Sequence, residues 1–384
     1  MAKASKTKET KAKADKTKAS KVKESKSSKA KEDKAKAKKP KVAKTKESKA
    51  KAENIRPVDS KKKRAKKPAT EKKRLPRSRG QVYSGIEELP LGFASENLTK
   101  GCLVLEGGAF RGLYTSGVLD ALMENDINLQ STIGVSAGAL YGFCYTGAQL
   151  GSARINLRYR HDNRYVGSRA IKKNHGIFGW DFLFGRIQLQ TAEERRRFFD
   201  ERRRFVAVVT NIDTGKAEYL EKGDVDHRPC YDIVAATCAS ASMPYISKPV
   251  WVGASRYLDG GCADKIPFQW AIDEGYEKII VVRTRDRAFR RDTGKATERM
   301  AKATYGKEFP AFAEVFGKSD FAYNEQCDRL EELEREGRLL VIYPSEPVEV
   351  TRLEKDMEKL GALYHLGYDD TMTMMDKIKA YLAE

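Results

Sequence analysis

The sequence predicts an α/β fold, a three-layer sandwich in which helices cover both faces of a mostly parallel central sheet. From Leu98 onward, short apolar runs alternate with segments of helical periodicity. Runs such as 102–106 and 278–282 resemble strands that are buried on both faces. Strands that alternate with helices favour a parallel sheet. We expect a disordered, lysine-rich tail to precede this domain.

The net charge of +20 belongs to that tail. Residues 1–80 contain 33 Lys and Arg against 9 Asp and Glu, whereas the rest of the chain contains 41 against 45. No Phe, Trp or Tyr occurs before Tyr83. Such a segment cannot bury enough apolar surface to offset its chain entropy, so residues 1–82 are expected to be disordered. No apolar segment follows the charges, so we expect no signal peptide. The longest uncharged stretch, 127–153, is broken by polar residues and glycines, so we expect no membrane helix.

The body begins with a strand, a loop and a helix. The apolar run 102–106 predicts a buried strand, and residues 113–126 have helical periodicity. Between them lies GGAFRG, a glycine-rich loop that leaves backbone amides free to approach a ligand. A phosphate cradle and an oxyanion hole are both open interpretations. The dinucleotide and P-loop fingerprints are not met, which favours the oxyanion hole.

The second unit contains Gly-x-Ser-x-Gly around Ser136. The strand 131–136 precedes a helix at 137–149, which is the strand–turn–helix setting of a nucleophile elbow. In that setting the serine is exposed and the amide of Ala137 lies at a helix N-terminus, where it can donate to an oxyanion. The alternative is a tight strand–helix turn that merely contains a small serine.

The remaining elements follow the same alternation. Further strands are expected at 203–213, 217–221, 278–282 and 338–347, and further helices at 231–242, within 266–275 and over most of 350–382. Residues 286–336 are charged and helix-prone. The arginine-rich segment 192–204 predicts a solvated helix face, with a surface that contacts lipid headgroups as the alternative.

A serine nucleophile requires a base, and the chain has four histidines, His161, His175, His227 and His365. Chain order would allow a triad of Ser136, Asp259 and His365, although nothing local marks His365 as catalytic. Asp259 lies in RYLDGG, at the end of a short apolar run and before two glycines. A carboxylate there can accept the serine proton directly. A plain Asp-Gly-Gly turn is the alternative.

Together these segments resemble the patatin-like phospholipase family, in its bacterial branch. The family's three motifs occur here in order as EGGAFRG, GVSAG and DGG. Further similar segments are TNIDTG (210–215), ASMPYISKPV (241–250) and 257–282. The likeness covers residues 100–285 well and 286–384 loosely. It does not extend to the tail expected at 1–82, and it implies a patatin-like acyl hydrolase domain at 83–384, with a helical C-terminal portion from residue 286.

The resemblance also implies roles for individual residues. Ser136 would be the nucleophile and Asp259 its base. The oxyanion hole would be formed by Gly107, Gly108, Ala109 and Ala137, and Arg111 would fix the shape of the loop. The chain departs from the family's usual loop in that Glu106 replaces Asp and Ala109 replaces the third glycine.

The function expected from this resemblance is hydrolysis of lipid acyl esters, such as those of phospholipids, through an acyl-enzyme. No metal or cofactor is required. One alternative is an acyltransferase that uses the same Ser–Asp dyad. Another is a binding protein whose function lies in residues 1–80, through an anionic membrane or through nucleic acid. Nucleic acid is the less favoured partner, because the tail lacks aromatic residues that stack on bases.

The six cysteines are scattered without metal-ligand spacing, and we expect them to be reduced in a cytosolic core. The expected location is therefore cytoplasmic, with peripheral membrane contact as the alternative.

Overall fold

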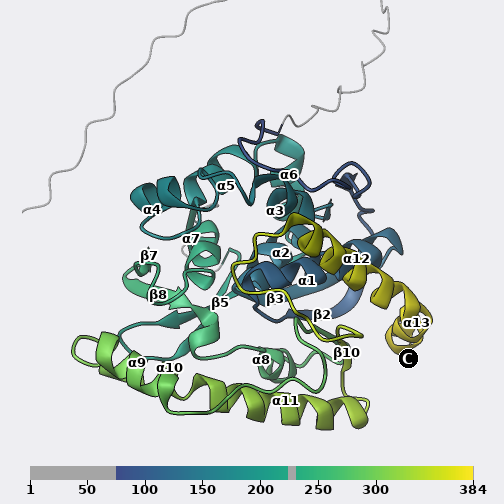
Figure 1. Ribbon diagram of the computed structural model, residues 1–384. Coiled ribbons are helices and arrows are strands. Elements are labelled where there is room, and N and C mark those ends of the chain that lie inside the picture. The colour runs from purple at the N-terminus through teal and green to yellow at the C-terminus, as the bar shows by residue number, and fades with distance from the viewer. Residues whose placement is uncertain (1–74, 224–230, 384) are drawn as a thin grey trace, which may run out of the picture. The chain divides into compact units, whose positions relative to one another are not determined.

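A mixed, mostly parallel sheet forms the centre of the fold. The computed structural model describes residues 75–223 and 231–383, and in this part of the chain eight strands lie in the order β10-β9-β2-β3-β5-β8-β7, with β6 paired to β5 (Figure 1). The strands are β2 (Thr99–Leu105), β3 (Leu129–Val135), β5 (Arg204–Asn211), β6 (Ala217–Glu221), β7 (Val250–Val252), β8 (Ser255–Asp259), β9 (Ile279–Val282) and β10 (Leu340–Ile342). All neighbouring pairs from β10 to β5 are parallel. The pairs β5–β6, β5–β8 and β8–β7 are antiparallel. The predicted α/β fold with a mostly parallel sheet is confirmed.

Helices surround this sheet, and a small two-stranded sheet of β1 (Gly92–Phe93) and β4 (Gln149–Leu150) lies apart from it. The helices before β5 are η1 (Ala109–Arg111), α1 (Gly112–Glu124), α2 (Ala137–Thr146), α3 (Ala153–Tyr159), α4 (Ser168–Asn174), α5 (Trp180–Arg186) and α6 (Ala192–Phe198). Those after β6 are α7 (Tyr231–Ser240), η2 (Gly260–Cys262), α8 (Phe268–Asp273), α9 (Ala296–Tyr305), α10 (Pro310–Gly317), α11 (Ser319–Arg335), α12 (Met357–Thr373) and α13 (Met375–Ala383).

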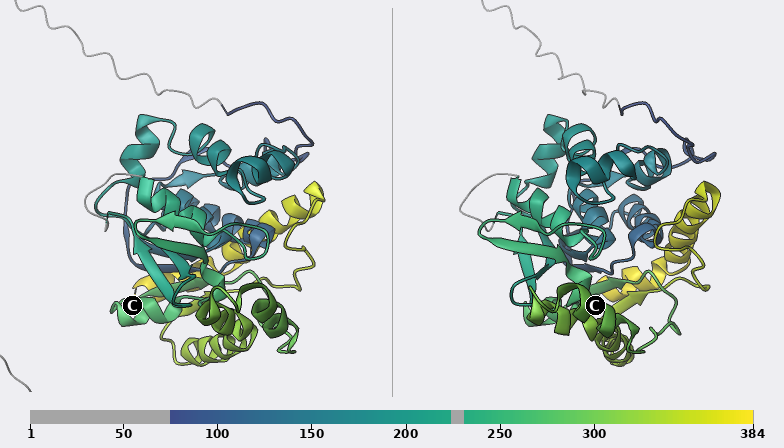
Figure 2. Two further views of the ribbon diagram at one scale, coloured as in Figure 1. Left: turned by 90° about the vertical axis from the view of Figure 1, so that its left-hand side faces the viewer. Right: turned by 60° about the vertical axis from the view of Figure 1, so that its left-hand side comes forward.

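The alternation of side chains along the strands creates two cores. Leu103 and Leu105 of β2 pack with α1, α2 and α12, whereas Cys102 and Val104 point to the opposite face, where α8 and α11 cover them. Figures 1 and 2 show the same layers, with α8 and α11 on one side of the sheet and α1, α2 and α12 on the other. The parallel strands are thus apolar on both faces, as their uninterrupted sequence predicted.

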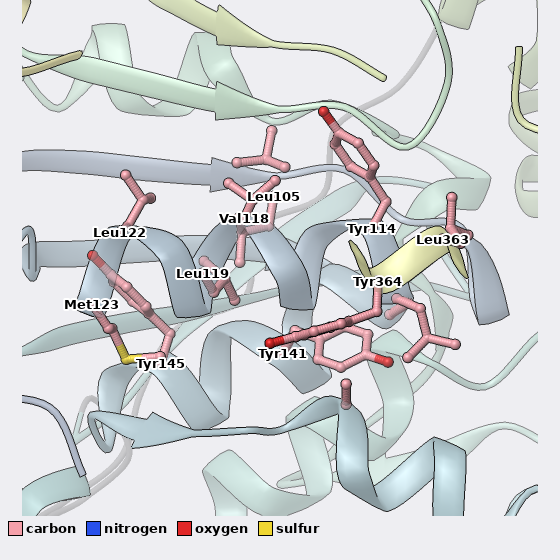
Figure 3. Packing of buried hydrophobic residues seen from close by; sticks show 14 of the residues in the cluster. Leu105, Tyr114, Val118, Leu119, Leu122, Met123, Tyr141, Tyr145, Leu363 and Tyr364 are labelled. Atoms are coloured by element: carbon pink, nitrogen blue, oxygen red, sulfur yellow. The ribbon is translucent and has the colours of Figure 1, made fainter. Parts of the chain in front are cut away.

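Helix α12, near the C-terminus, lies directly against α1, where Tyr114 and Tyr364 take part in the apolar cluster (Figure 3). The backbones approach so closely that a Cβ on Gly117 would lie 2.0 Å from the carbonyl oxygen of Tyr364. A Cβ on Gly367 would lie 2.1 Å from that of Tyr114. The Tyr364 hydroxyl donates to buried Asp120 at 2.9 Å. Residues 357–373 are therefore built into the same domain as the first helix.

Some predicted helices and strands differ from those in the structure, and some predicted features lie outside residues 75–223 and 231–383. Helix α6 ends at Phe198, and Arg203 is buried, so 192–204 is not one solvated helix face. The strand expected at 338–347 comprises only Leu340–Ile342, and helices α3 to α5 were not predicted. Among the described residues, five cysteines are buried, whereas Cys230, His227 and residues 1–74 of the predicted tail lie outside the described residues.

Within the described ranges 75–223 and 231–383, no helix is long and apolar enough to cross a bilayer.

Candidate active site

Ser136 lies at an abrupt turn between the end of β3 and the start of α2. Its φ of 55° and ψ of −121° are strained for a residue with a side chain. The Ser136 amide donates to the Ser240 hydroxyl at 2.9 Å, which ties the turn to the end of α7. As the first residue of α2, Ala137 has no acceptor within the helix for its amide. This strand–turn–helix geometry is the one expected of a nucleophile elbow.

The two glycines of the motif are required by close packing. A Cβ on Gly134 would lie 2.5 Å from the carbonyl of Gly138. A Cβ on Gly138 would lie 2.4 Å from the carbonyl oxygen of Leu105 in β2. Any side chain at either position would push the elbow away from the sheet, so the spacing of the motif reflects backbone contact as well as chemistry.

The antiparallel strand β8 brings Asp259 to Ser136. On β5, Val208 pairs with Val135 at the end of β3, and the next residue, Val209, pairs with Asp259 at the end of β8. Strand β6 pairs with one edge of β5 at these residues. Strands β3 and β8 therefore both pair with the opposite edge of β5, where the end of β3 meets the end of β8. The Ser136 hydroxyl donates to Asp259 Oδ2 at 2.7 Å.

The environment of Asp259 sets its basicity. Burial raises its pKa to about 6, while hydrogen bonds from Ser136 and the Gly261 amide and the positive charges of Arg352 and Lys265 act in the opposite direction. The Gly261 amide donates to Asp259 Oδ1 at 2.8 Å and fixes the orientation of the carboxylate. Asp259 is therefore largely ionised at neutral pH and is a stronger base than an exposed aspartate.

The predicted oxyanion loop lies beside the serine. A Cβ on Gly107 would be 3.0 Å from the Ser136 Cβ. Within the part of the chain that the structure describes, the amides of Gly107, Gly108 and Ala109 have no hydrogen-bond partner. Ala109 has a φ of 51°, a conformation that glycine would adopt at lower cost. Three unpartnered amides next to a serine are suited to bind an oxyanion.

A buried ion pair holds this loop from behind. Glu106 Oε2 accepts a hydrogen bond from Arg283 Nε at 3.0 Å and another from the Thr284 amide at 2.6 Å. The Tyr323 hydroxyl donates to Glu106 Oε1 at 2.9 Å, and the Thr284 hydroxyl donates to the Gly107 carbonyl at 2.9 Å. Burial alone would raise the pKa of Glu106, but Arg283 and these donors hold it below its ordinary value. Sequence reasoning noted Glu106 only as a departure from the family's loop and missed its partners.

Arg111 was predicted to fix the shape of the loop. Its backbone amide donates to the Gly108 carbonyl at 3.1 Å. Its side chain is 5% exposed and lines the cavity in front of Ser136. Among the described residues, no hydrogen bond joins its guanidinium to the loop, and its Nε has no partner. The side chains that hydrogen-bond the loop or its neighbours are therefore those of Glu106 and Thr284, and Arg111 contributes through its backbone amide.

A cavity of about 390 Å³ opens in front of Ser136 and Asp259. Its apolar lining comprises Val135, Met243, Pro244, Tyr245, Ile246, Met300, Phe316 and Leu353. Four of these side chains are large apolar groups exposed to solvent, namely Tyr245 (41%), Ile246 (41%), Met300 (53%) and Leu353 (42%). The site thus combines polar groups around the serine with exposed apolar side chains at its walls.

The described histidines do not line the cavity that contains Ser136 and Asp259. His161, His175 and His365 are all absent from the lining of the cavity. The His365 ring contacts the rings of Tyr364 and Tyr83 instead. The arrangement in the described residues is therefore a serine and a carboxylate without an imidazole between them.

Residues 103–272 match the family described as patatin-like phospholipase. The chain contains a patatin-like phospholipase domain. A second match, to a domain of unknown function (DUF6363), covers residues 309–383. The resemblance inferred from the three motifs is confirmed at the level of the family, which is one of lipid hydrolases.

The proteins that are similar to the chain include two curated proteins and one solved structure. Uncharacterized protein YjjU of Escherichia coli (strain K12) is 25% identical over 273 residues, which are 69% of this chain and 74% of the relative. Probable lipid hydrolase 463L of Invertebrate iridescent virus 6 is 25% identical over 186 residues, 44% of this chain and 62% of the relative. The crystal structure of VipD from Legionella pneumophila has a TM-score of 0.41 and 16% identity, and covers 81% of this chain and 72% of that one.

Residues outside the patatin-like match complete the cavity of the patatin-like domain. Asp320, Arg352 and Leu353 line it, and Tyr323 supports Glu106 from the same C-terminal part. These residues come from the segment that matches the domain of unknown function. No sequence pattern marked them, because helical periodicity in 319–335 reports packing rather than chemistry.

Proposed function

We propose that this chain is a serine acyl hydrolase that cleaves carboxylic esters of lipids, with Ser136 as nucleophile and Asp259 as base. The observation that carries the proposal is the 2.7 Å hydrogen bond from the Ser136 hydroxyl to Asp259, at a strained turn that faces a cavity. Membership of a lipid hydrolase family supports the substrate class.

The reaction proceeds in two halves. Asp259 accepts the hydroxyl proton as Ser136 Oγ attacks the ester carbonyl carbon, and the carbonyl oxygen becomes an oxyanion. The amides of Gly107, Gly108, Ala109 and Ala137 stabilise this charge, and the loss of one such donor typically costs about 10²–10³ in turnover. The ester bond then breaks, and the leaving alkoxide takes the proton from Asp259. The product of this half is an acyl-enzyme on Ser136.

In the second half, Asp259 accepts a proton from a water molecule, and the resulting hydroxide attacks the acyl carbon. The Ser136–acyl bond breaks, Ser136 Oγ recovers the proton and the fatty acid leaves. The apolar side chains Tyr245, Ile246, Met300 and Leu353 are suited to contact the acyl chain or the lipid surface. Contact of residues 1–80 with an anionic membrane, which would raise the local substrate concentration, stays a prediction.

Labelling with a fluorophosphonate tests the nucleophile. The probe should modify one peptide, and mass spectrometry should locate the adduct at Ser136. The Ser136→Ala protein should neither label nor hydrolyse a soluble ester. Ser84→Ala is the matched control, because Ser84 is exposed and hydrogen-bonds Glu358 outside the cavity. Esterase activity that survives in Ser136→Ala would refute the assignment.

A further inference from the structure

The cavity in front of the dyad has an excess of basic groups that the mechanism does not use. Its four basic side chains are Arg111, Lys265, Arg291 and Arg352. Three carboxylates share the wall. One of them, Glu106, is already neutralised by buried Arg283, and another, Asp320, pairs with Arg291 at 3.4 Å. Asp259 is then the one remaining carboxylate in the cavity wall, and Arg111, Lys265 and Arg352 are the three remaining cations.

Those three cations are poorly compensated. Within residues 75–223 and 231–383, the side chains of Arg111 and Arg352 form no ion pair or hydrogen bond, and Lys265 Nζ donates only to the Ser319 carbonyl at 2.9 Å. Burial and the neighbouring charges of Arg285 and Arg352 together lower the pKa of Arg111 to about 9, although Glu106 acts in the opposite direction. Burial likewise lowers the pKa of Lys265 to about 8.

A cation without a partner is costly in a partly buried site, and a bound anion would remove that cost. Guanidinium groups form paired hydrogen bonds with phosphate oxygens, and an ammonium adds a point charge. The same cavity carries exposed Tyr245, Ile246 and Met300. A ligand that satisfies both sets of groups has an anionic phosphate next to apolar chains.

We propose that Arg111, Lys265 and Arg352 form a subsite for the phosphate of an anionic phospholipid, so that the lipid is held by its headgroup while Ser136 attacks an acyl ester. This inference rests on the proposed function for the identity of the reacting bond. The subsite distinguishes anionic phospholipids from neutral acylglycerols. Inorganic phosphate shares the chemistry but lacks the apolar part.

The first test measures preference in solution, with short-chain monomeric lipids so that the lysine-rich segment does not act through a membrane surface. Dihexanoyl phosphatidylglycerol should have a higher kcat/KM than dihexanoyl glycerol. In the Lys265→Gln/Arg352→Gln protein this ratio should fall by about tenfold or more, because each charged hydrogen bond is worth at least that much. Arg329→Gln is the control, since Arg329 is half exposed on α11 and pairs with Glu332.

The second test measures binding without turnover. Calorimetry with the Ser136→Ala protein should detect the anionic lipid, and the two added Gln substitutions should weaken its binding by a similar factor. This measurement succeeds or fails independently of hydrolysis, so it separates the subsite from the proposed function. Three outcomes would overturn the subsite. The double variant could keep the preference for dihexanoyl phosphatidylglycerol, dihexanoyl glycerol could bind as tightly as the anionic lipid, or inorganic phosphate could bind while the anionic lipid does not.

Discussion

Replacement of Asp259 by Asn should abolish activity and at the same time stabilise the fold. The carboxylate is 7% exposed, and burial raises its pKa from 3.8 to about 6. Since one pH unit corresponds to 1.36 kcal/mol, ionised Asp259 lowers the free energy of unfolding by about 3 kcal/mol at about pH 7.5. Asparagine has the same shape and keeps an acceptor for the Gly261 amide, but it cannot take a proton from Ser136.

The stability gained in Asp259→Asn should depend on pH in a definite way. A raised pKa in the folded state favours the folded protein while the group is protonated, and this advantage is lost as the pH rises from about 4 through about 6. Urea denaturation of Asp259→Asn should therefore show a gain of about 3 kcal/mol at about pH 7.5 that disappears below about pH 4. Hydrolysis of a soluble ester should be lost at every pH. A destabilised variant, or one with normal turnover, would refute the reasoning.

Three further predictions concern the same site. His365→Ala should keep kcat/KM within about twofold, because the proposed dyad does not involve it; a loss of about 10³ would indicate a triad instead. The kcat/KM of the unmodified protein should rise with pH through about 6 as Asp259 becomes the ionised base, which a pH profile in constant ionic strength measures. Glu106→Gln should lower the free energy of unfolding by about 3–5 kcal/mol, since its buried arginine loses its counter-charge, and should lower kcat through the oxyanion loop. Urea denaturation measures the free energy of unfolding, and turnover of a soluble ester measures kcat. A Glu106→Gln protein that is fully stable and fully active would contradict this role of the ion pair.

The local parts of the site were predictable because each is encoded in a short segment. The apolar strand before Ser136, the glycines around it and the helix after it specify the elbow within a few residues. The glycine-rich loop after β2 is similarly local. The structure places Gly107, Ser136 and Asp259 together around one cavity, as the order of the three motifs suggested. Their catalytic roles stay a proposal.

The contacts that were not predicted join segments far apart in the chain. Glu106 and Arg283 are 177 residues apart, and each looks in the sequence like an ordinary charge at a strand end. Tyr323 lies on a helix whose pattern reports only its packing. The antiparallel direction of β8 is equally invisible in a run of five residues, yet it decides which end of that strand meets the serine.

Burial and the charged wall of the cavity act on the Asp259 carboxylate in opposite directions. Burial makes Asp259 a stronger base, whereas the positive charges of Arg352 and Lys265 weaken it by favouring its ionised form. An anion that binds these cations would cancel part of their field and raise the pKa of Asp259 towards neutrality. If the proposed subsite is correct, a phosphate-bearing substrate therefore does more than fit the cavity. Its charge brings the base closer to the strength that proton abstraction from Ser136 requires, and a neutral ester lacks this effect.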